Sequence, residues 1–126
     1  KKKLHNNEKI MLDGAHAETD AKNLANYLRN INLPKYAIWA MMKNKEPDLF
    51  IKQFKGIFKK IKNIKIEKEP ASLSNKLLFQ IAKKNNYNVE ISNNFQEAFK
   101  NIRSKEKKVI CIFGSLYLCG SVLNRN

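Results

Sequence analysis

The sequence predicts an α/β fold of the Rossmann-like type: a mostly parallel sheet of five or six strands with helices on both faces. Short apolar runs alternate regularly with longer amphipathic stretches, which is the pattern of successive strand–helix units. Some runs, above all residues 36–41 and 108–113, are apolar without alternation, as in strands buried on both faces. A length of 126 residues with 43% hydrophobic residues fits a single globular domain, residues 1–126.

The first half of the chain predicts three strands and two helices. A strand over residues 9–12 precedes a helix over 19–30, whose apolar residues form one stripe: Ala21, Leu24, Ala25 and Leu28. A second strand is expected over 36–41. Pro47 suits the first turn of a helix over 48–60, with a buried face of Ile51, Phe54, Phe58 and Ile61. In a third strand, over 63–67, apolar residues alternate with charged ones, so we expect it near an edge of the sheet.

The second half predicts three helices and two strands. The helices are expected over residues 74–85, 94–104 and 116–123, and the strands over 88–91 and 108–113. Asn94 and Glu97 have the spacing of a capping box, which indicates a helix start. Cys111 lies in the most apolar strand and is expected to be a buried thiol.

Small and polar residues follow several of the predicted strands. Asp13 and His16 follow the first strand, Lys43 and Lys45 the second, Ser72 the third, and Ser115 the strand over 108–113. The carboxyl ends of parallel strands meet at one edge of the sheet, where α/β proteins bind ligands. Gly14 and Ala15 are small enough to let a ligand approach closely. Asp13 and Ser115 also have purely structural interpretations, as a turn residue and a helix N-cap.

Charge, hydropathy and cysteine content limit the classes of function. A formal net charge of +14 comes from 22 lysines and only 3 arginines, spread along the chain, so we expect a solvated basic surface that attracts polyanionic substrates. No apolar run is long enough for a membrane span, and the basic N-terminus has no apolar region behind it.

Two cysteines make no disulfide or metal framework, so we expect a cytoplasmic protein. Because no initiator Met is present, we interpret the chain as a fragment.

Four motifs in colinear order resemble those of one enzyme family. Asp13-Gly14-Ala15-His16 resembles the start of an Asp-Gly-Ala-His-Asn-Pro signature, with Ala17-Glu18 in place of Asn-Pro. Residues 41–46 resemble a Met-x-x-Asp-Lys-Asp loop, and residues 70–74 resemble Pro-Arg-Ala-Leu-Ser with Ala71 in place of the arginine. Gly114-Ser115-Leu116-Tyr117 matches a final Gly-Ser-Leu-Tyr motif. The chain thus resembles the C-terminal, glutamate-ligase domain of folylpolyglutamate synthase/dihydrofolate synthase, in the Mur ligase superfamily.

The resemblance implies an ATP-dependent amide ligase that adds L-glutamate to dihydropteroate or tetrahydrofolate through an acyl phosphate. It implies that Asp13, Gly14, Ala15 and His16 contact ATP, with His16 as the catalytic residue. It also implies that Ser115, Lys45 and Ser72 bind glutamate. ATP and Mg²⁺ would be held mainly by a preceding N-terminal domain, because this sequence contains no Gly-x-x-x-x-Gly-Lys-Ser/Thr loop and we assign it no metal ligand. The fragment alone would be inactive.

The expected partners are the chain's own N-terminal ATPase domain, a folate or dihydropteroate, and L-glutamate, with no nucleic acid, no membrane and a monomeric state. Two alternatives stay open: the C-terminal domain of a Mur-type peptidoglycan ligase, and a non-catalytic basic module that binds nucleotides or nucleic acid. A receiver-like signalling domain fits less well, since such domains need a phosphoacceptor Asp after a central strand and paired acids near the first strand, and the first strand offers only Asp13. Whether dihydropteroate, folates or both are substrates is also open.

Overall fold

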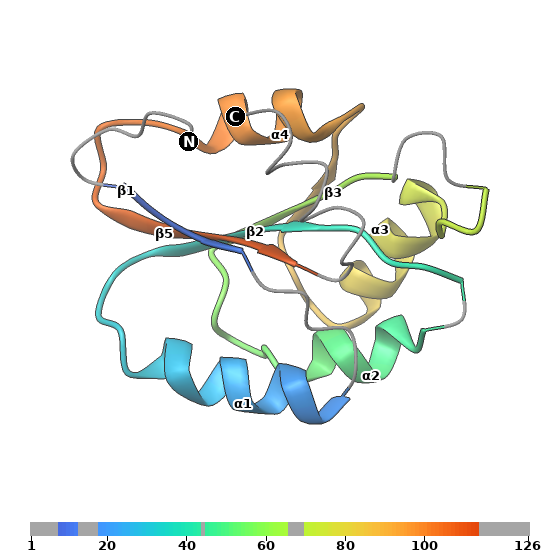
Figure 1. Ribbon diagram of the computed structural model, residues 1–126, viewed down its shortest axis with the longest axis horizontal. Helices are drawn as coiled ribbons and strands as arrows, with labels where there is room; N and C mark the ends of the chain where they lie inside the picture. The colour runs from blue at the N-terminus through green and yellow to red at the C-terminus, as the bar shows by residue number, and fades with distance from the viewer. Residues whose placement is uncertain (1–7, 13–17, 44, 66–69, 114–126) are drawn as a thin grey trace.

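The strands of the protein form one parallel sheet. The computed structural model describes residues 8–12, 18–43, 45–65 and 70–113. In chain order these form β1 (Glu8–Leu12), α1 (Glu18–Arg29), β2 (Lys35–Trp39), α2 (Pro47–Lys52), β3 (Lys60–Asn63), α3 (Asn75–Lys84), β4 (Val89–Ile91), α4 (Phe95–Ile102) and β5 (Lys108–Phe113). The sheet order is β1-β5-β2-β3-β4, and every pair is parallel (Figure 1). The predicted α/β fold with a parallel sheet is confirmed.

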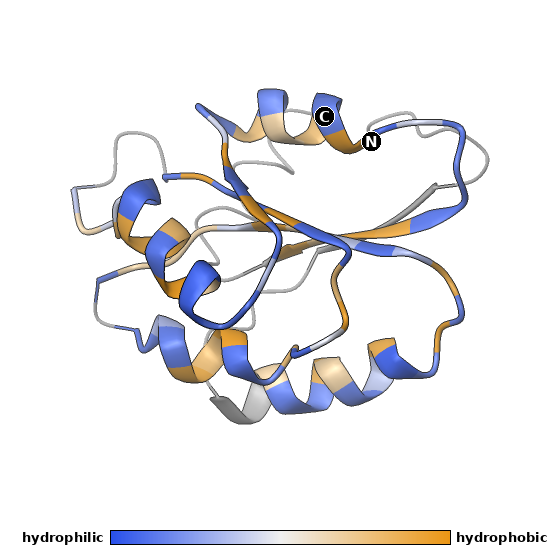
Figure 2. Ribbon diagram, turned by 180° about the vertical axis from the view of Figure 1, so that it is seen from behind, coloured by the Kyte–Doolittle hydropathy of each residue, from blue (hydrophilic) through white to orange (hydrophobic). Residues whose placement is uncertain are grey.

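Helices cover both faces of this sheet. In Figure 1, α1 and α2 lie below the sheet and α4 lies above it. Helix α3 belongs to the side of α1 and α2, because Leu78 and Ala82 share a core cluster with Leu28 and Phe50. Seen from behind in Figure 2, the hydrophobic residues of the helices face the sheet and the hydrophilic ones face outward. Two helical layers around a parallel sheet explain why β2 and β5 are apolar without alternation.

Two hydrophobic clusters form the core. The larger cluster lies on the side of α1, α2 and α3, and it buries the predicted stripe of α1: Ala21, Leu24, Ala25 and Leu28. It also holds Trp39, which is fully buried and stacks on Phe50 with ring centroids 6.3 Å apart. The smaller cluster lies under α4, where Phe95 and Phe99 pack with Ile38, Ile110 and Ile112. Cys111 is 1% exposed, so the predicted buried thiol is confirmed.

The predicted bounds of the second helix and third strand are wrong. Helix α2 covers only Pro47–Lys52, and turns follow through residue 57, where Gly56 has a φ of +78°. That left-handed backbone conformation favours glycine and interrupts helical geometry. The expected apolar positions are still buried, namely Ile51, Phe54, Phe58 and Ile61. Their helical spacing therefore comes from a short helix, a turn and the start of a strand.

Strand β3 lies next to β4, the edge strand of the sheet, so the expected position near an edge is confirmed. It begins at Lys60 and pairs with β2 on one side and β4 on the other. Its charged residue Lys62 is 6% exposed, because its ammonium bonds to Glu90 on β4. The charge of Lys62 within this strand is thus balanced by an ion pair with the edge strand β4.

The helix starts agree with the capping residues in the sequence. The Asn94 side chain accepts a hydrogen bond from the backbone N–H of Glu97 at 2.8 Å, and the Glu97 carboxylate accepts from the backbone N–H of Asn93 at 3.0 Å. Ser74 caps α3 in the same way, accepting from the N–H of Leu77 at 3.1 Å. These bonds satisfy N–H groups that have no partner inside a helix. The helix expected over 116–123 lies outside the described residues.

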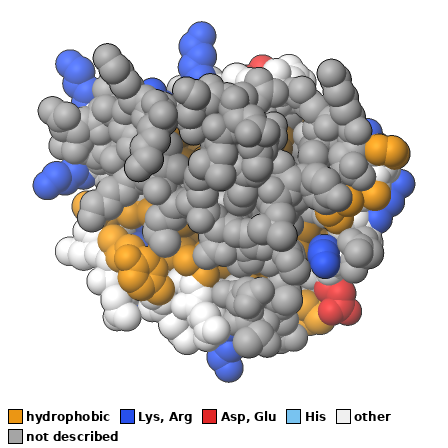
Figure 3. Space-filling view, in the orientation of Figure 1, with side chains coloured by type: hydrophobic (Ala, Val, Ile, Leu, Met, Phe, Trp, Pro, Cys, Tyr) orange, Lys and Arg blue, Asp and Glu red, His pale blue; other side chains and the backbone are white. Residues whose placement is uncertain are grey.

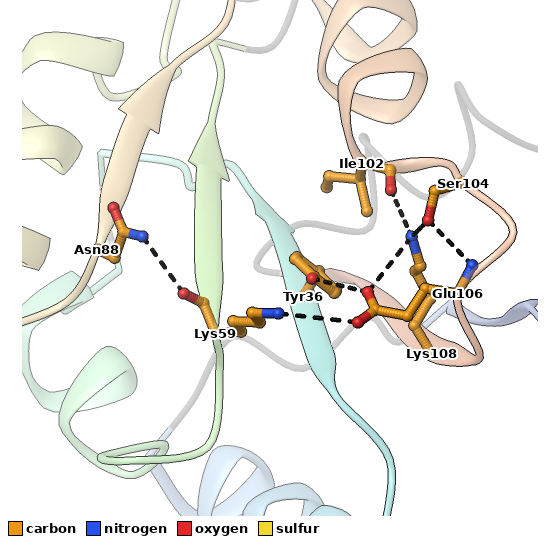
Figure 4. Close-up of polar contacts among 7 residues, drawn as sticks. All are labelled: Tyr36, Lys59, Asn88, Ile102, Ser104, Glu106 and Lys108. Carbon is orange, nitrogen blue, oxygen red and sulfur yellow. Dashed lines mark hydrogen bonds and ion pairs between the residues drawn. The ribbon is translucent and has the colours of Figure 1, made fainter.

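Polar contacts join three strands at the amino edge of the sheet (Figure 4). The Lys108 side chain is 2% exposed, and its ammonium donates to the carbonyl oxygen of Ile102 at 2.7 Å and to the Ser104 hydroxyl. Glu106 accepts a hydrogen bond from the Tyr36 hydroxyl at 3.0 Å and lies 3.7 Å from the Lys59 ammonium. Burial and this carboxylate raise the pKa of Tyr36. The cluster fixes the loop between α4 and β5 against the starts of β2 and β3.

Basic side chains are dispersed on the face of the molecule that Figure 3 shows. On the face shown in Figure 3, lysine and arginine side chains stand apart around the rim and do not merge into one patch. This arrangement matches the spread of lysines along the sequence. In the part of the chain that the structure describes, no helix has the length and apolarity needed to cross a membrane.

Candidate functional site at the carboxyl edge of the sheet

The parallel strands end together at one edge, opposite the cluster of Figure 4. Leu12 of β1 lies opposite Ile112 of β5, and Ile38 of β2 lies on the other side of Ile112. Strands β1 and β5 therefore end side by side at this edge. The candidate residues on these stretches lie outside the described residues, namely Asp13, Gly14, Ala15, His16 and Ser115.

The loops that follow β2 and β3 are joined at this edge. Met42 and Ser72 form an antiparallel bridge. Next to it, the N–H of Lys43 donates to the carbonyl oxygen of Ala71 at 2.7 Å, and the N–H of Leu73 donates to that of Met41 at 2.8 Å. Backbone bonds thus bring together the segments of Lys45 and Ser72, which are far apart in the sequence. The structure supports the prediction that both follow strand ends at one edge.

Lys45 and Ser72 differ in what their side chains offer to a ligand. Ser72 is 3% exposed, and its hydroxyl donates to the carbonyl oxygen of Leu73 at 3.1 Å. Lys45 is half-buried, and its backbone N–H donates to the carbonyl oxygen of Met42 at 3.1 Å. No hydrogen bond or ion pair to another described residue engages the Lys45 ammonium. The lysine is therefore the more accessible of the two for an anionic ligand.

Asn63 is a candidate that the sequence interpretation missed. It is fully buried at the last position of β3, and its amide nitrogen donates to the carbonyl oxygen of Asn75 at 2.5 Å. Its amide oxygen has no hydrogen-bond partner among the described residues. A buried acceptor without a donor is costly and is often found near a functional site. The predicted strand over 63–67 placed Asn63 at a strand start, whereas it is the last residue of β3. The available signal was a polar residue between apolar Ile61 and Ile64.

The described part of this edge fits an anion better than a metal ion. Lys43 is exposed and Lys45 half-buried, both on the loop after β2, and ammonium groups bind phosphate and carboxylate oxygens. Among the described residues, no group of three His, Cys, Asp or Glu side chains is placed to hold a metal ion.

The fold and the site define the class of a parallel α/β domain with lysine side chains at the carboxyl edge of its sheet. The family model described as dihydrofolate synthetase, C-terminal domain, matches residues 1–125. The chain belongs to this family, and the resemblance found in the four motifs is confirmed. No curated protein matches the chain.

Solved structures of related enzymes share the fold. A folylpolyglutamate synthase from Thermotoga maritima is 26% identical with a TM-score of 0.79, and the match covers 98% of this chain and 30% of that one. Escherichia coli FolC in complex with DHPP and ADP is 16% identical with a TM-score of 0.81, covering 92% and 28%. A bifunctional folylpolyglutamate synthase/dihydrofolate synthase from Yersinia pestis, complexed with AMPPNP and Mn ion, is 18% identical with a TM-score of 0.79, covering 92% and 28%. The chain thus spans less than a third of the length of each.

Proposed function

We propose that this chain is the C-terminal domain of an ATP-dependent amide ligase that joins L-glutamate to a dihydropteroate or folate carboxylate. The observation that carries the proposal is the family match over residues 1–125. The solved relatives support it, since one is a complex with DHPP and ADP and another a complex with AMPPNP and Mn ion. Bound ATP supplies the phosphoryl group that activates the carboxylate, and the glutamate amine then displaces phosphate.

In this proposal the chain contributes residues that face the nucleotide and residues that bind glutamate. Asp13, Gly14, Ala15 and His16 face the nucleotide, and the His16 ring acts beside the transferred phosphoryl group as a donor or proton acceptor. Ser115, Lys45 and Ser72 bind the glutamate carboxylates. The helix that the sequence predicts after Ser115 would offer backbone N–H groups at its start, and Lys45 offers an ammonium. A preceding domain holds the P-loop and most of the contacts to ATP and Mg²⁺.

Phosphate release by the full-length protein tests the proposal. We expect release to require ATP, Mg²⁺, L-glutamate and one acceptor, with dihydropteroate and tetrahydrofolate assayed separately to distinguish the two activities. The isolated 126-residue chain, which contains no P-loop sequence, is expected to release none above background. Turnover by the isolated chain would contradict the two-domain site. Glutamate-independent release by the full-length protein, or release that needs a peptidoglycan precursor, would contradict the substrate class.

A further inference from the structure

A second site lies at the amino edge of the sheet, away from the proposed ligase site. A pocket of about 340 Å³ opens where α2 and α3 end, just before β3 and β4 begin. Its lining residues are Lys52, Lys55, Lys84, Asn85, Asn86 and Tyr87. Volumes of this size are typical of small-molecule sites. None of these residues belongs to the motifs shared with the ligase family.

The end of helix α3 forms one wall of the pocket. Asn86 adopts a positive φ of 64°, and its N–H donates to the carbonyl oxygen of Lys83 at 3.0 Å. The N–H of Tyr87 donates to the carbonyl oxygen of Ala82, also at 3.0 Å, which completes a Schellman motif at the end of α3. The Tyr87 hydroxyl donates to the carbonyl oxygen of Ile51 at 2.9 Å and so ties this turn to α2.

The lining carries an excess of positive charge. Asp48 is the acid in contact with it: its carboxylate lies 3.1 Å from the Lys52 ammonium and accepts from the Asn85 amide at 3.0 Å. Lys55 and Lys84 form no ion pair with any described residue, although the charge of Lys84 contributes to the lowered pKa of Asp48. The Arg29 guanidinium adds charge beside them, since it donates to the carbonyl oxygens of Gln53 and Lys55.

A purely helix-stabilising role does not account for these lysines. Basic residues near a helix C-terminus normally offset the partial negative charge of its last carbonyls. At the end of α3, however, backbone N–H groups of the Schellman turn already bond to those carbonyls. Lys55 lies beyond the last residue of α2 altogether. Their ammonium groups are therefore available to a ligand in the pocket.

We propose that this pocket binds a compact polyvalent anion that carries phosphate groups. Ammonium groups bind phosphate as point charges, and they need no fixed planar geometry to do so. The side-chain amide of Asn86 adds an uncharged polar group at the same wall, whereas the Asn85 amide nitrogen already donates to Asp48 and to the carbonyl oxygen of Ile81. The site needs neither the nucleotide nor the glutamate of the ligase reaction, so it stands independently of the proposed function.

Titration of the isotope-labelled 126-residue chain with inorganic tripolyphosphate, followed by NMR, tests this site. We expect amide shifts at Lys55 and residues 84–87. Replacing the two exposed lysines together, Lys55→Gln with Lys84→Gln, should weaken this binding on the order of 10-fold, since each exposed charge contributes a few-fold. The matched control is Lys100→Gln with Lys107→Gln, which removes two exposed lysines elsewhere on the surface and should change the affinity less than about two-fold.

Further measurements make each outcome decisive. The charge-retaining pair Lys55→Arg and Lys84→Arg should bind like the unmodified chain, and Trp39 fluorescence melts show that every variant is folded. Equal weakening by the Gln pair and its control would mean diffuse charge attraction and would overturn the site. Shifts confined to the carboxyl edge would also overturn it. Citrate binding as tightly as tripolyphosphate would overturn the assignment to phosphate.

Discussion

At the residue scale, His16 and Ser115 follow neighbouring strands but have different proposed roles. In the full-length enzyme, His16→Ala should lower kcat on the order of 100-fold, as the loss of one preorganised donor to a transition state does. The stability change should stay within about 1 kcal/mol, because the sequence predicts an exposed ring after Gly14-Ala15, and the loss of an exposed ring leaves no large cavity. Ser115→Ala should chiefly raise the KM for glutamate, because it binds the carboxylate equally in the ground and transition states.

Steady-state kinetics and melting temperatures of both variants check these expectations together. Ser115→Gly is the matched control for Ser115→Ala, since glycine is nearly as good a helix N-cap as threonine and also lacks the hydroxyl. A near-normal kcat for His16→Ala, or a melted domain, would show that the histidine is structural. A Ser115→Ala variant with unchanged KM would leave only the capping role for that hydroxyl.

Lys108 is the residue whose loss should destabilise the fold most clearly. Its buried ammonium donates to the carbonyl oxygen of Ile102, the last residue of α4, and to the Ser104 hydroxyl. Lys108→Met keeps the apolar stem but leaves that buried carbonyl without this donor, which should lower the free energy of unfolding by about 1–3 kcal/mol. Urea unfolding measures this change. The exposed neighbour variant Lys107→Met should cost less than about 0.5 kcal/mol; equal costs would contradict the role given to Lys108.

At the element scale, the sequence predicts well wherever one pattern decides the structure. Helix α1 follows from its apolar stripe, α4 from Asn94 and Glu97, and β5 from its continuous apolar run. The sequence fails between residues 48 and 67, where buried residues of a short helix, a turn and a strand happen to have helical spacing. Gly56 was the signal that the helix could not continue, since its φ of +78° is accessible mainly to glycine.

The candidate site was predictable in its position but not in its contacts. Parallel strands must end at one edge, so polar residues after several strands indicate a shared site. The bridge between Met42 and Ser72, however, joins two loops through backbone groups, and backbone bonding leaves no residue-type signal. Asn63 was missed for a related reason, because its place at the carboxyl edge depends on where β3 ends.

Glu90 links the edge strand β4 to β3 and should make their pairing depend on pH. Hydrogen bonds from Lys62 and Lys60 lower the pKa of Glu90 to about 2. A carboxyl group whose pKa is lower in the folded state stabilises that state above its unfolded pKa, near 4.5, and loses the contribution as pH falls toward 2. Because its side chain is 48% exposed, we expect less than about 1 kcal/mol.

Urea unfolding of Glu90→Gln against the unmodified chain measures this contribution. The difference in free energy of unfolding should be present at pH 6 and should shrink at pH 2.5. Glu46→Gln serves as the control, since Glu46 is exposed and caps no helix through its side chain. A difference that stays constant between the two pH values, or one that Glu46→Gln reproduces, would contradict the ion-pair explanation.

At the scale of the whole molecule, the two faces of the sheet depend on each other. The cluster under α1, α2 and α3 and the cluster under α4 share the strands β2 and β5: Ala37 and Cys111 face one side, while Ile38 and Ile112 face the other. Neither helical layer can separate without exposing one face of the same central strands. The two clusters of the described residues thus form one linked core.

We therefore expect the isolated 126-residue chain to fold by itself and to unfold in one cooperative step. Trp39 is the only tryptophan and is fully buried against Phe50, so its fluorescence reports on the larger cluster. Far-UV circular dichroism reports on all helices, including α4 on the opposite face. In a two-state transition both signals change at the same urea concentration and the same temperature. Fluorescence loss that precedes the loss of helix, or a broad melt without a baseline, would show that the two clusters unfold separately and that the chain requires another domain for its stability.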